Sequence, residues 1–299
     1  MAPSSDPEAF RRAYEACEQF ARAHYENFPV ASSLLPASMR PHIAAVYAFA
    51  RIGDDIADEG MDASPIRRGR LARWQQRLHD AVATAPTPSE TDAEDTLIVC
   101  ALAHSMRERS LPLQLFDDLM SAFAQDIETT RYASWSDLFD YCRRSANPVG
   151  RLVLRIAGYD NAALDRSSDA LCTALQLTNF WQDFGRDWAH GRLYVPAEVS
   201  AAHGADERDL RGGPLTPAWV QAIGECARIT GARFDDGRSV CNGVAGRLRF
   251  ELRATWLGGR RVLDRVVSRG AGLAVDRPRL GRADLAILLW QTLRWDSAV

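Results

Sequence analysis

Hydrophobic positions recur at intervals of three and four residues through most of the chain, whereas sustained alternation of apolar and polar residues is almost absent. The first spacing places apolar side chains on one face of an α-helix, and alternation is typical of half-buried strands. The pattern therefore predicts a mainly helical protein. The helices that we expect cover residues 7–27, 38–59, 65–84, 93–109, 112–129, 135–157, 161–189, 216–238, 240–269 and 282–295.

Proline and glycine punctuate this helical pattern. Pro41 suits the first turn of the second predicted helix, and Pro148 should kink or interrupt a helix near Asn147. The stretch 190–217 is rich in glycine and proline, so we expect a long loop there and no second domain. The chain is therefore expected to form a single domain over residues 1–299.

Composition and charge narrow the class of protein. Hydrophobic residues make up 46% and charged residues 25% of the 299 residues, which is typical of a soluble globular protein. All 36 basic residues are arginine, and the net charge of −3 lacks the strong basic field of a general nucleic-acid binder. The six cysteines form no C-x-x-C pair and follow no secretory segment, so we expect a cytoplasmic protein without disulfides or zinc.

A first acidic cluster reads Asp-Asp-Ile-Ala-Asp-Glu over residues 54–59, directly after an apolar helical run. Asp54 and Asp58 are four residues apart, so their side chains share one helix face. Like charges at this spacing destabilise an isolated helix by a few tenths of a kcal/mol. The cluster therefore predicts a compensating cation, and a solvated acidic helix end is the alternative when it is taken alone.

A second cluster follows 125 residues later, where Asn179, Asp183 and Asp187 form a polar stripe on a helix that also carries Phe180 and Trp181. Two such stripes can face each other across a helical bundle and hold hard divalent cations through oxygen ligands. Magnesium keeps several waters and commonly completes its shell with substrate phosphate. Paired aspartate stripes without histidine therefore suggest Mg²⁺ that bridges to a diphosphate.

With these clusters in this order, the chain resembles the squalene and phytoene synthases, the head-to-head prenyl synthases. The landmarks of that likeness span nearly the whole chain: Leu34-Leu35-Pro36, Tyr47, Arg51, Tyr141-Cys142, Val149-Gly150, Gln176 and the run from Arg192 to Pro196. Residues 27–32 and 143–150 resemble the bacterial branch that makes hydroxysqualene for hopanoid biosynthesis. Asn27 and the pair Asn147-Pro148 depart from the wider family pattern, which favours this branch over ordinary condensation of two C15 diphosphates.

The resemblance implies an all-α, isoprenoid-synthase-like helical bundle with a central cavity. The implied reaction converts presqualene diphosphate and water to hydroxysqualene and diphosphate, with more than one Mg²⁺ ion and without NADPH. The residues carried over are Asp54, Asp58, Asp183 and Asp187 for the metal, Tyr47, Arg51, Tyr141 and Tyr194 for catalysis, and Phe28, Ser32, Gln176, Asn179 and Arg192 for substrate binding.

Two other functions stay open on the sequence. One is a condensing synthase that joins two farnesyl or geranylgeranyl diphosphates with the same four aspartates. The other is a noncatalytic relative that keeps the fold for binding or assembly. The resemblance also implies a neighbouring enzyme that supplies presqualene diphosphate, a reductase that consumes hydroxysqualene, and peripheral contact with the inner membrane surface because substrate and product are apolar.

Overall fold

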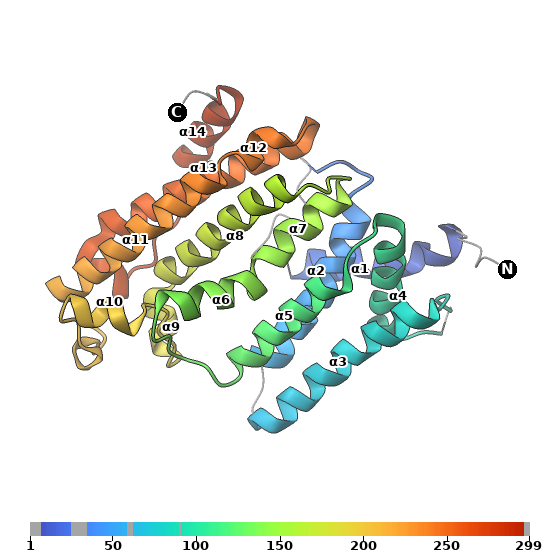
Figure 1. Ribbon diagram of the computed structural model, residues 1–299, viewed down its shortest axis with the longest axis horizontal. Coiled ribbons are helices and arrows are strands. Elements are labelled where there is room, and N and C mark those ends of the chain that lie inside the picture. Colours follow the sequence, from blue (N-terminus) through green and yellow to red (C-terminus); the bar gives the residue numbers. More distant parts are fainter. Residues whose placement is uncertain (1–6, 25–34, 59–61, 90, 296–299) are drawn as a thin grey trace. The chain divides into compact units, whose positions relative to one another are not determined.

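The computed structural model describes residues 7–24, 35–58, 62–89 and 91–295 (Figure 1). Phe28 and Ser32, predicted to bind substrate, lie outside these ranges. Within them the prediction of an all-α fold is confirmed, because the only strand-like pairing among the described residues is an isolated bridge between Arg131 and Leu193. The α-helices are α1 (Pro7–Ala23), α2 (Arg40–Asp58), α3 (Ser64–Thr84), α4 (Glu94–Arg109), α5 (Leu113–Asp126), α6 (Trp135–Ser145), α7 (Asn147–Ile156), α8 (Ala162–Gln182), α9 (Phe184–Ala189), α10 (Ala197–Ala202), α11 (Pro217–Gly237), α12 (Val240–Gly243), α13 (Gly246–Arg269) and α14 (Arg282–Leu293).

The chain divides into two compact units. The first unit comprises residues 1–128 and 151–160, and therefore contains α1 to α5. The second unit comprises residues 129–150 and 161–299, with α6 and α8 to α14. Helix α7 contributes residues to both. The expectation of a single domain over the whole chain stays a prediction.

Helix α2 is the centre of the first unit, where it packs against α1, α3, α4 and α5. Its Phe49 is fully buried and stacks on Trp74 of α3 with ring centroids 5.1 Å apart. The indole nitrogen of Trp74 donates to the Phe49 carbonyl at 3.1 Å, so the buried N–H group of Trp74 has a hydrogen-bond partner across the α2–α3 contact. This packing fixes α2, the helix that carries the first acidic cluster.

A polar network ties α2 to α1 and α4 at the other end of the helix. The Tyr14 hydroxyl lies 2.9 Å from Ser105 Oγ and 2.8 Å from His104 Nδ1, and His42 Nδ1 lies 2.9 Å from the same Ser105 oxygen. Burial raises the pKa of Tyr14 to about 12 and lowers the pKa of His42 to about 4. Both side chains are therefore neutral near pH 7 and share hydrogen bonds without a buried charge.

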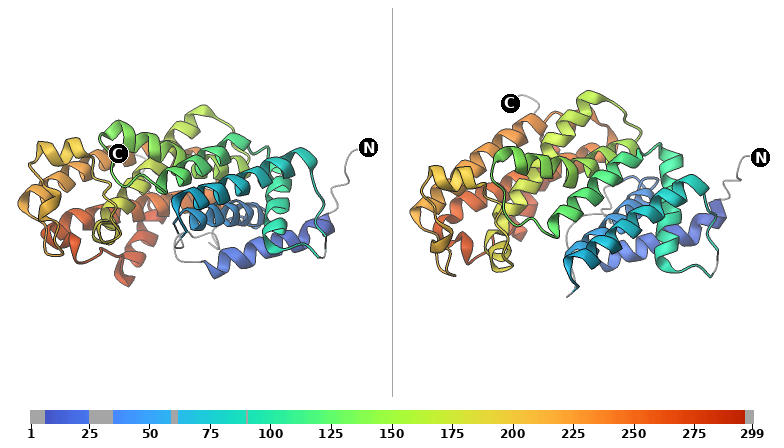
Figure 2. Two further views of the ribbon diagram at one scale, coloured as in Figure 1. Left: turned by 90° about the horizontal axis from the view of Figure 1, so that it is seen from below. Right: turned by 60° about the horizontal axis from the view of Figure 1, so that its bottom comes forward.

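The core of the second unit is formed by α8, α11 and α13, which lie alongside one another (Figures 1 and 2). A Cβ atom on Gly237 would stand 2.6 Å from the backbone nitrogen of Leu171, so α11 and α8 approach more closely than any side chain would allow. Trp181 of α8 is fully buried and donates to Thr230 Oγ1 of α11 at 2.9 Å. Its contacts make Trp181 a core residue.

Three predicted helices are shorter or divided in the structure. The interruption near Asn147 is confirmed, because α6 ends at Ser145 and α7 begins at Asn147. The continuous helix over 161–189 is wrong, since α8 ends at Gln182 and a separate helix starts at Phe184. The helix expected over 240–269 is divided into α12 and α13 by two residues of extended backbone.

The long loop predicted for 190–217 is only partly right. It contains α10 and a 3₁₀ turn, η1 (Glu207–Asp209), although glycine does occupy left-handed backbone there at Gly191, Gly204 and Gly212. A second 3₁₀ segment, η2 (Gly270–Ala274), follows α13. Across the residues that the structure describes, no helix is both long and apolar enough to cross a bilayer.

Candidate functional site

The first cluster occupies one face of α2. Arg51 of this helix contacts two aspartates that lie one turn after it. Its guanidinium donates to Asp54 Oδ2 at 3.0 Å and lies 2.6 Å from Asp55 Oδ1. The spacings of three and four residues bring these side chains together on any straight helix. The compensating cation that the sequence requires is therefore supplied, in the protein alone, by an arginine of the same helix.

Tyr47 lies one turn before Arg51 on the same helix. Its hydroxyl donates to the His24 carbonyl at 2.8 Å, and partial burial raises its pKa, while Arg51 opposes that shift. Tyr47 is therefore a neutral phenol at the N-terminal end of the acidic face of α2. This face is only partly buried, because the Asp54 side chain is 35% exposed and Asp58, the last residue of α2, is exposed.

The second cluster is built around a break in the helix at Asp183, which has φ −92° and ψ 9°. The amide of Asp183 donates to the Asn179 carbonyl and the amide of Asp187 donates to the Asp183 carbonyl, both at 2.9 Å. These bonds keep the four-residue spacing of a helix through the break. Asn179, Asp183 and Asp187 therefore keep their helical spacing across the break. Asn179 is exposed and Gln176 is half-buried on α8.

Arg277, which the sequence reading missed, holds Asp183 from 94 residues away. Its Nε and Nη2 atoms donate to the two carboxylate oxygens of Asp183, the second at 3.0 Å. Gln182 Nε2 donates to the Pro278 carbonyl at 2.6 Å and attaches the same loop to α8. A fork-like contact of this kind is the strongest pairing that arginine makes with a carboxylate.

Gly185 explains how this distant loop reaches Asp183. A Cβ atom at Gly185 would stand 2.1 Å from the Ala274 carbonyl oxygen, so any side chain would displace η2 from α9. Because η2 ends three residues before Arg277, the missing Cβ brings the arginine into reach. The glycine within the Asp183–Asp187 motif was the available sequence signal for the loop.

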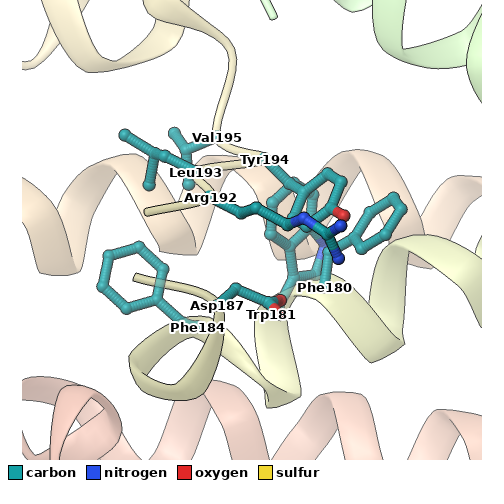
Figure 3. A pocket seen from close by; sticks show the side chains of 8 residues that line it. All are labelled: Phe180, Trp181, Phe184, Asp187, Arg192, Leu193, Tyr194 and Val195. Carbon is teal, nitrogen blue, oxygen red and sulfur yellow. The ribbon is translucent and has the colours of Figure 1, made fainter. Parts of the chain in front are cut away.

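Asp187 lies in a small recess with Arg192 and Tyr194. Burial, and then the neighbouring Asp183, raise the pKa of Asp187 to about 7, while Arg192 opposes the shift. The Arg192 amide also donates to the Asp187 carbonyl at 2.8 Å. In Figure 3 the Asp187 carboxylate and the Arg192 guanidinium both point into the recess.

Aromatic rings form the apolar wall beside this recess. Tyr194 stacks on Phe180 with centroids 3.7 Å apart and planes 6° from parallel, and Tyr132 covers Tyr194 at 5.8 Å. Tyr141 is buried, 5.6 Å from Tyr132 and 6.1 Å from Phe180. The Leu193 amide donates to the Thr130 carbonyl at 3.0 Å, and this bridge aligns the two tyrosine-bearing segments. Tyr132 was missed because nothing local marks the bridge.

The donors fit a hard divalent cation by their chemistry. Each cluster offers carboxylate oxygens without a histidine or cysteine among its predicted ligands, which suits Mg²⁺ better than zinc. Within the described ranges, no group of three or more Asp, Glu, His or Cys side chains is arranged to hold a metal alone. Asp54 and Asp58 belong to the first unit and Asp183 and Asp187 to the second, so a shared metal site stays a prediction.

Comparison with known proteins identifies the family. The profile described as squalene/phytoene synthase matches residues 21–284. The chain belongs to the squalene/phytoene synthase family. The family match covers both acidic clusters, and the resemblance read from the sequence is confirmed.

Relatives within this family include three named hydroxysqualene synthase. That of Zymomonas mobilis is 40% identical over 62% of this chain, and the aligned part spans 59% of that relative's length. That of Rhodopseudomonas palustris is 35% identical over 71% of this chain and 69% of its own. The crystal structure of squalene synthase HpnC from Alicyclobacillus acidocaldarius matches with a TM-score of 0.79 and 36% identity, over 87% of this chain and 95% of that chain.

The family assignment leaves the individual residue roles as predictions. In the first unit, Tyr47, Arg51 and Asp54 lie on one helix face, with Asp58 at its end. In the second unit, the other predicted site residues that the structure describes lie around the helix break and the recess. Gln176 and Asn179 lie earlier on α8. Both regions combine acidic oxygens with arginine, a combination suited to binding a metal ion and a diphosphate together.

Proposed function

We propose that this member of the squalene/phytoene synthase family is a hydroxysqualene synthase, which converts presqualene diphosphate and water to hydroxysqualene and diphosphate. The observation that carries the proposal is that three relatives with this name are 34–40% identical to the chain. Because the aligned part covers 59% of the Zymomonas mobilis relative, activity and substrate are inferred rather than inherited outright.

The reaction begins when the bond between carbon and the diphosphate oxygen breaks and its electron pair leaves on the diphosphate. Negative charge grows on the leaving group, so fixed positive charge stabilises the transition state more than the bound substrate. Arg51 in the first unit and Arg192 in the second are the arginines that we assign to this task. Arg277, which holds Asp183, positions the carboxylate rather than the substrate.

Asp54, Asp58, Asp183 and Asp187 would hold Mg²⁺, which when bound supplies Lewis-acid stabilisation of the departing diphosphate. The arginine contacts at Asp54 and Asp183 keep these carboxylates oriented in the protein alone. Asn179 adds a neutral oxygen donor on the same stripe, and Gln176 lies one turn before it to orient water or substrate.

The carbocation left behind rearranges and is then attacked by the oxygen of water, which loses a proton. A neutral tyrosine suits this step because its hydroxyl both donates and accepts a hydrogen bond. We assign water positioning to Tyr194 or Tyr141 in the aromatic wall, and we place Tyr47 near the diphosphate beside Arg51. The rings of Phe180 and Tyr194 would also exclude water from one side of the recess. Their π-faces would stabilise the carbocation intermediate.

A condensing activity on two farnesyl or geranylgeranyl diphosphates is the second candidate. Phytoene synthase 1 of Arabidopsis thaliana is 28% identical over 92% of this chain, a longer alignment than those to the hydroxysqualene synthases. The same aspartates would serve either reaction. A dehydrosqualene synthase structure matches with a TM-score of 0.83 at 21% identity, which supports the fold alone.

Product analysis separates the two. The purified protein is incubated with Mg²⁺ and either presqualene diphosphate or farnesyl diphosphate, each with and without NADPH, and the lipid product is identified by mass. A C30 alcohol made from presqualene diphosphate without NADPH supports the proposal. Conversion of farnesyl diphosphate moves the protein to the condensing group, and no product from either substrate favours a noncatalytic role.

The proposal also places the protein in a sequence of reactions. An enzyme that makes presqualene diphosphate must precede it, and a reductase must remove the hydroxyl group afterwards. We place all three in the cytoplasm at the inner membrane surface, because a C30 product is insoluble in water.

A further inference from the structure

Helix α14 buries two polar side chains and one leucine, and it exposes most of its large apolar side chains. Asp284, Leu288 and Thr292 recur every four residues and are buried against the second unit. On the remaining faces, four large apolar side chains are 57–65% exposed: Leu285, Leu289, Trp290 and Leu293. An ordinary surface helix shows the opposite arrangement.

Contacts at both ends of α14 hold it in this orientation on α13 (Figure 1). At its start the buried Asp284 carboxylate accepts from Arg261 at 3.0 Å and from Arg265 at 2.7 Å. Beyond its end the Trp295 ring meets Trp256 at 5.4 Å and lies under the Arg238 guanidinium at 4.8 Å. Rotating α14 to bury its leucines would break a buried, hydrogen-bonded carboxylate contact, so the outward apolar face is a built feature.

The segment that contains this face is rich in arginine, although several of these arginines pair with carboxylates. Residues 246–299 contain eleven arginines and five acidic residues, a net charge of +6 in a chain whose net charge is −3. Arg279 and Arg282 are exposed at the start of α14 and Arg294 is exposed at its end, where its guanidinium lies 5.3 Å from the Trp290 ring centre. Arginines therefore flank the apolar residues at both ends of the helix.

We propose that α14 is a docking surface for a lipid bilayer that contains anionic headgroups. The exposed leucines and Trp290 would enter the boundary between headgroups and acyl chains, and the flanking arginines would contact lipid phosphates. The helix would lie on the membrane, since it does not qualify as a spanning segment.

A bilayer suits this surface better than a second copy of the chain. A symmetric dimer built on α14 would bring two identical faces together, so the positive segments of both copies would meet. Anionic lipid instead neutralises them. The docking surface includes none of the residues assigned to catalysis, so it stands whether or not the proposed activity is correct.

The test is flotation of the full-length protein with vesicles of phosphatidylcholine, with and without phosphatidylglycerol, at low and high salt. The unmodified protein should float with the anionic vesicles and be released by salt. Leu289→Glu should weaken binding by about tenfold or more, because it removes an inserted side chain and adds a repelled charge. Arg282→Gln should weaken binding roughly fivefold, since one basic residue near the surface is lost.

Two matched controls use exposed residues of the same types elsewhere. Ile66→Glu changes an apolar side chain of α3 that is 53% exposed, and Arg228→Gln removes an exposed arginine of α11. Neither should alter flotation. Helicity by circular dichroism should be unchanged in every variant, because all four side chains are exposed.

Three results would overturn the proposal. The first is equal flotation of Leu289→Glu and the unmodified protein. The second is binding that does not depend on phosphatidylglycerol. The third is a dimer in light scattering that Leu289→Glu abolishes while neither protein binds vesicles, which would make α14 an interface between copies.

Discussion

The two acidic clusters solve the same electrostatic problem in different ways. The first lies on one uninterrupted helix, and its counter-charge, Arg51, comes from the same helix one turn away. The second lies where α8 ends and α9 begins, and its tightest counter-charge, Arg277, comes from a loop 94 residues later, while Arg186 of α9 lies 3.8 Å from the same carboxylate. The Asp54 side chain is 35% exposed and the Asp183 side chain 16%, so the more buried carboxylate has the more elaborate support.

The difference teaches that a shared motif does not imply a shared construction. Solvent and a neighbour on the same helix are enough for a half-exposed carboxylate. A more buried one needs a partner fixed by tertiary packing, since an uncompensated buried charge is strongly destabilising. The second cluster should therefore depend on the fold around it far more than the first.

The largest expected effect tests whether the clusters are equivalent in catalysis. Asp54→Asn and Asp183→Asn should each lower turnover of the correct prenyl diphosphate by about 100-fold or more, because each removes a carboxylate that we propose as a metal ligand. Steady-state assays at saturating Mg²⁺ measure this. Asp264→Asn, at an exposed aspartate of α13, is the control and should be silent. Full activity in either cluster variant would remove that cluster from the site.

The next test concerns the support under the second cluster. Gly185→Ala should lower the free energy of unfolding by about 2 kcal/mol, because the new methyl group meets the Ala274 carbonyl. Chemical denaturation measures the change. Gly224→Ala places the same methyl group in open space on α11 and should be neutral or stabilising by up to about 1 kcal/mol. Equal effects of the two substitutions would contradict the close approach of η2 and α9.

The counter-charges themselves give a smaller effect. Arg277→Gln should lower turnover by about tenfold, since Asp183 loses its fork-like contact and its fixed orientation. Arg51→Gln should lower turnover similarly by removing the charge that we assign to the diphosphate, and Arg228→Gln should leave turnover unchanged. Because Arg277 acts through Asp183, its loss should raise the Mg²⁺ concentration needed for half-maximal rate. An unchanged Mg²⁺ requirement would show that Arg277 only attaches the loop after η2 to α8.

The smallest effect examines the support under the first cluster through pH. An unfolded chain protonates His42 near pH 6.5, whereas the folded protein does so only near pH 4, so the unfolded state binds more protons between these values. Stability should therefore fall as the pH falls from 6.5 to 4, by about 1 kcal/mol after allowance for partial solvent exposure. His42→Asn should flatten this slope in urea titrations, and an unchanged slope would assign the pH dependence to other groups.

The sequence predicted what depends on neighbours along the chain. The apolar spacing located the main helices, and the spacings within each cluster placed Asp54 and Asp58 on one face of a helix and Asp187 in line with Asp183. Pro148 marked the interruption near Asn147. Each of these follows from helix geometry over a few residues.

What the sequence did not predict depends on contacts between distant segments. Arg277 holds the Asp183 carboxylate at the helix break, and the bridge between Arg131 and Leu193 holds the segment that carries Tyr194. No local pattern encodes either partner. Gly185 was the visible trace of the first contact, because a glycine inside a helical motif often marks a close backbone approach.

The anchoring of α14 at both ends has a consequence for how the protein would meet a membrane. Many surface-seeking segments are unstructured in water and become helical on contact, so they lose chain entropy at that moment. Here Asp284 and Trp295 already fix the helix in solution. Adding anionic vesicles should therefore leave the far-ultraviolet ellipticity unchanged. The helix should bind the membrane in its preformed state, without folding coupled to binding.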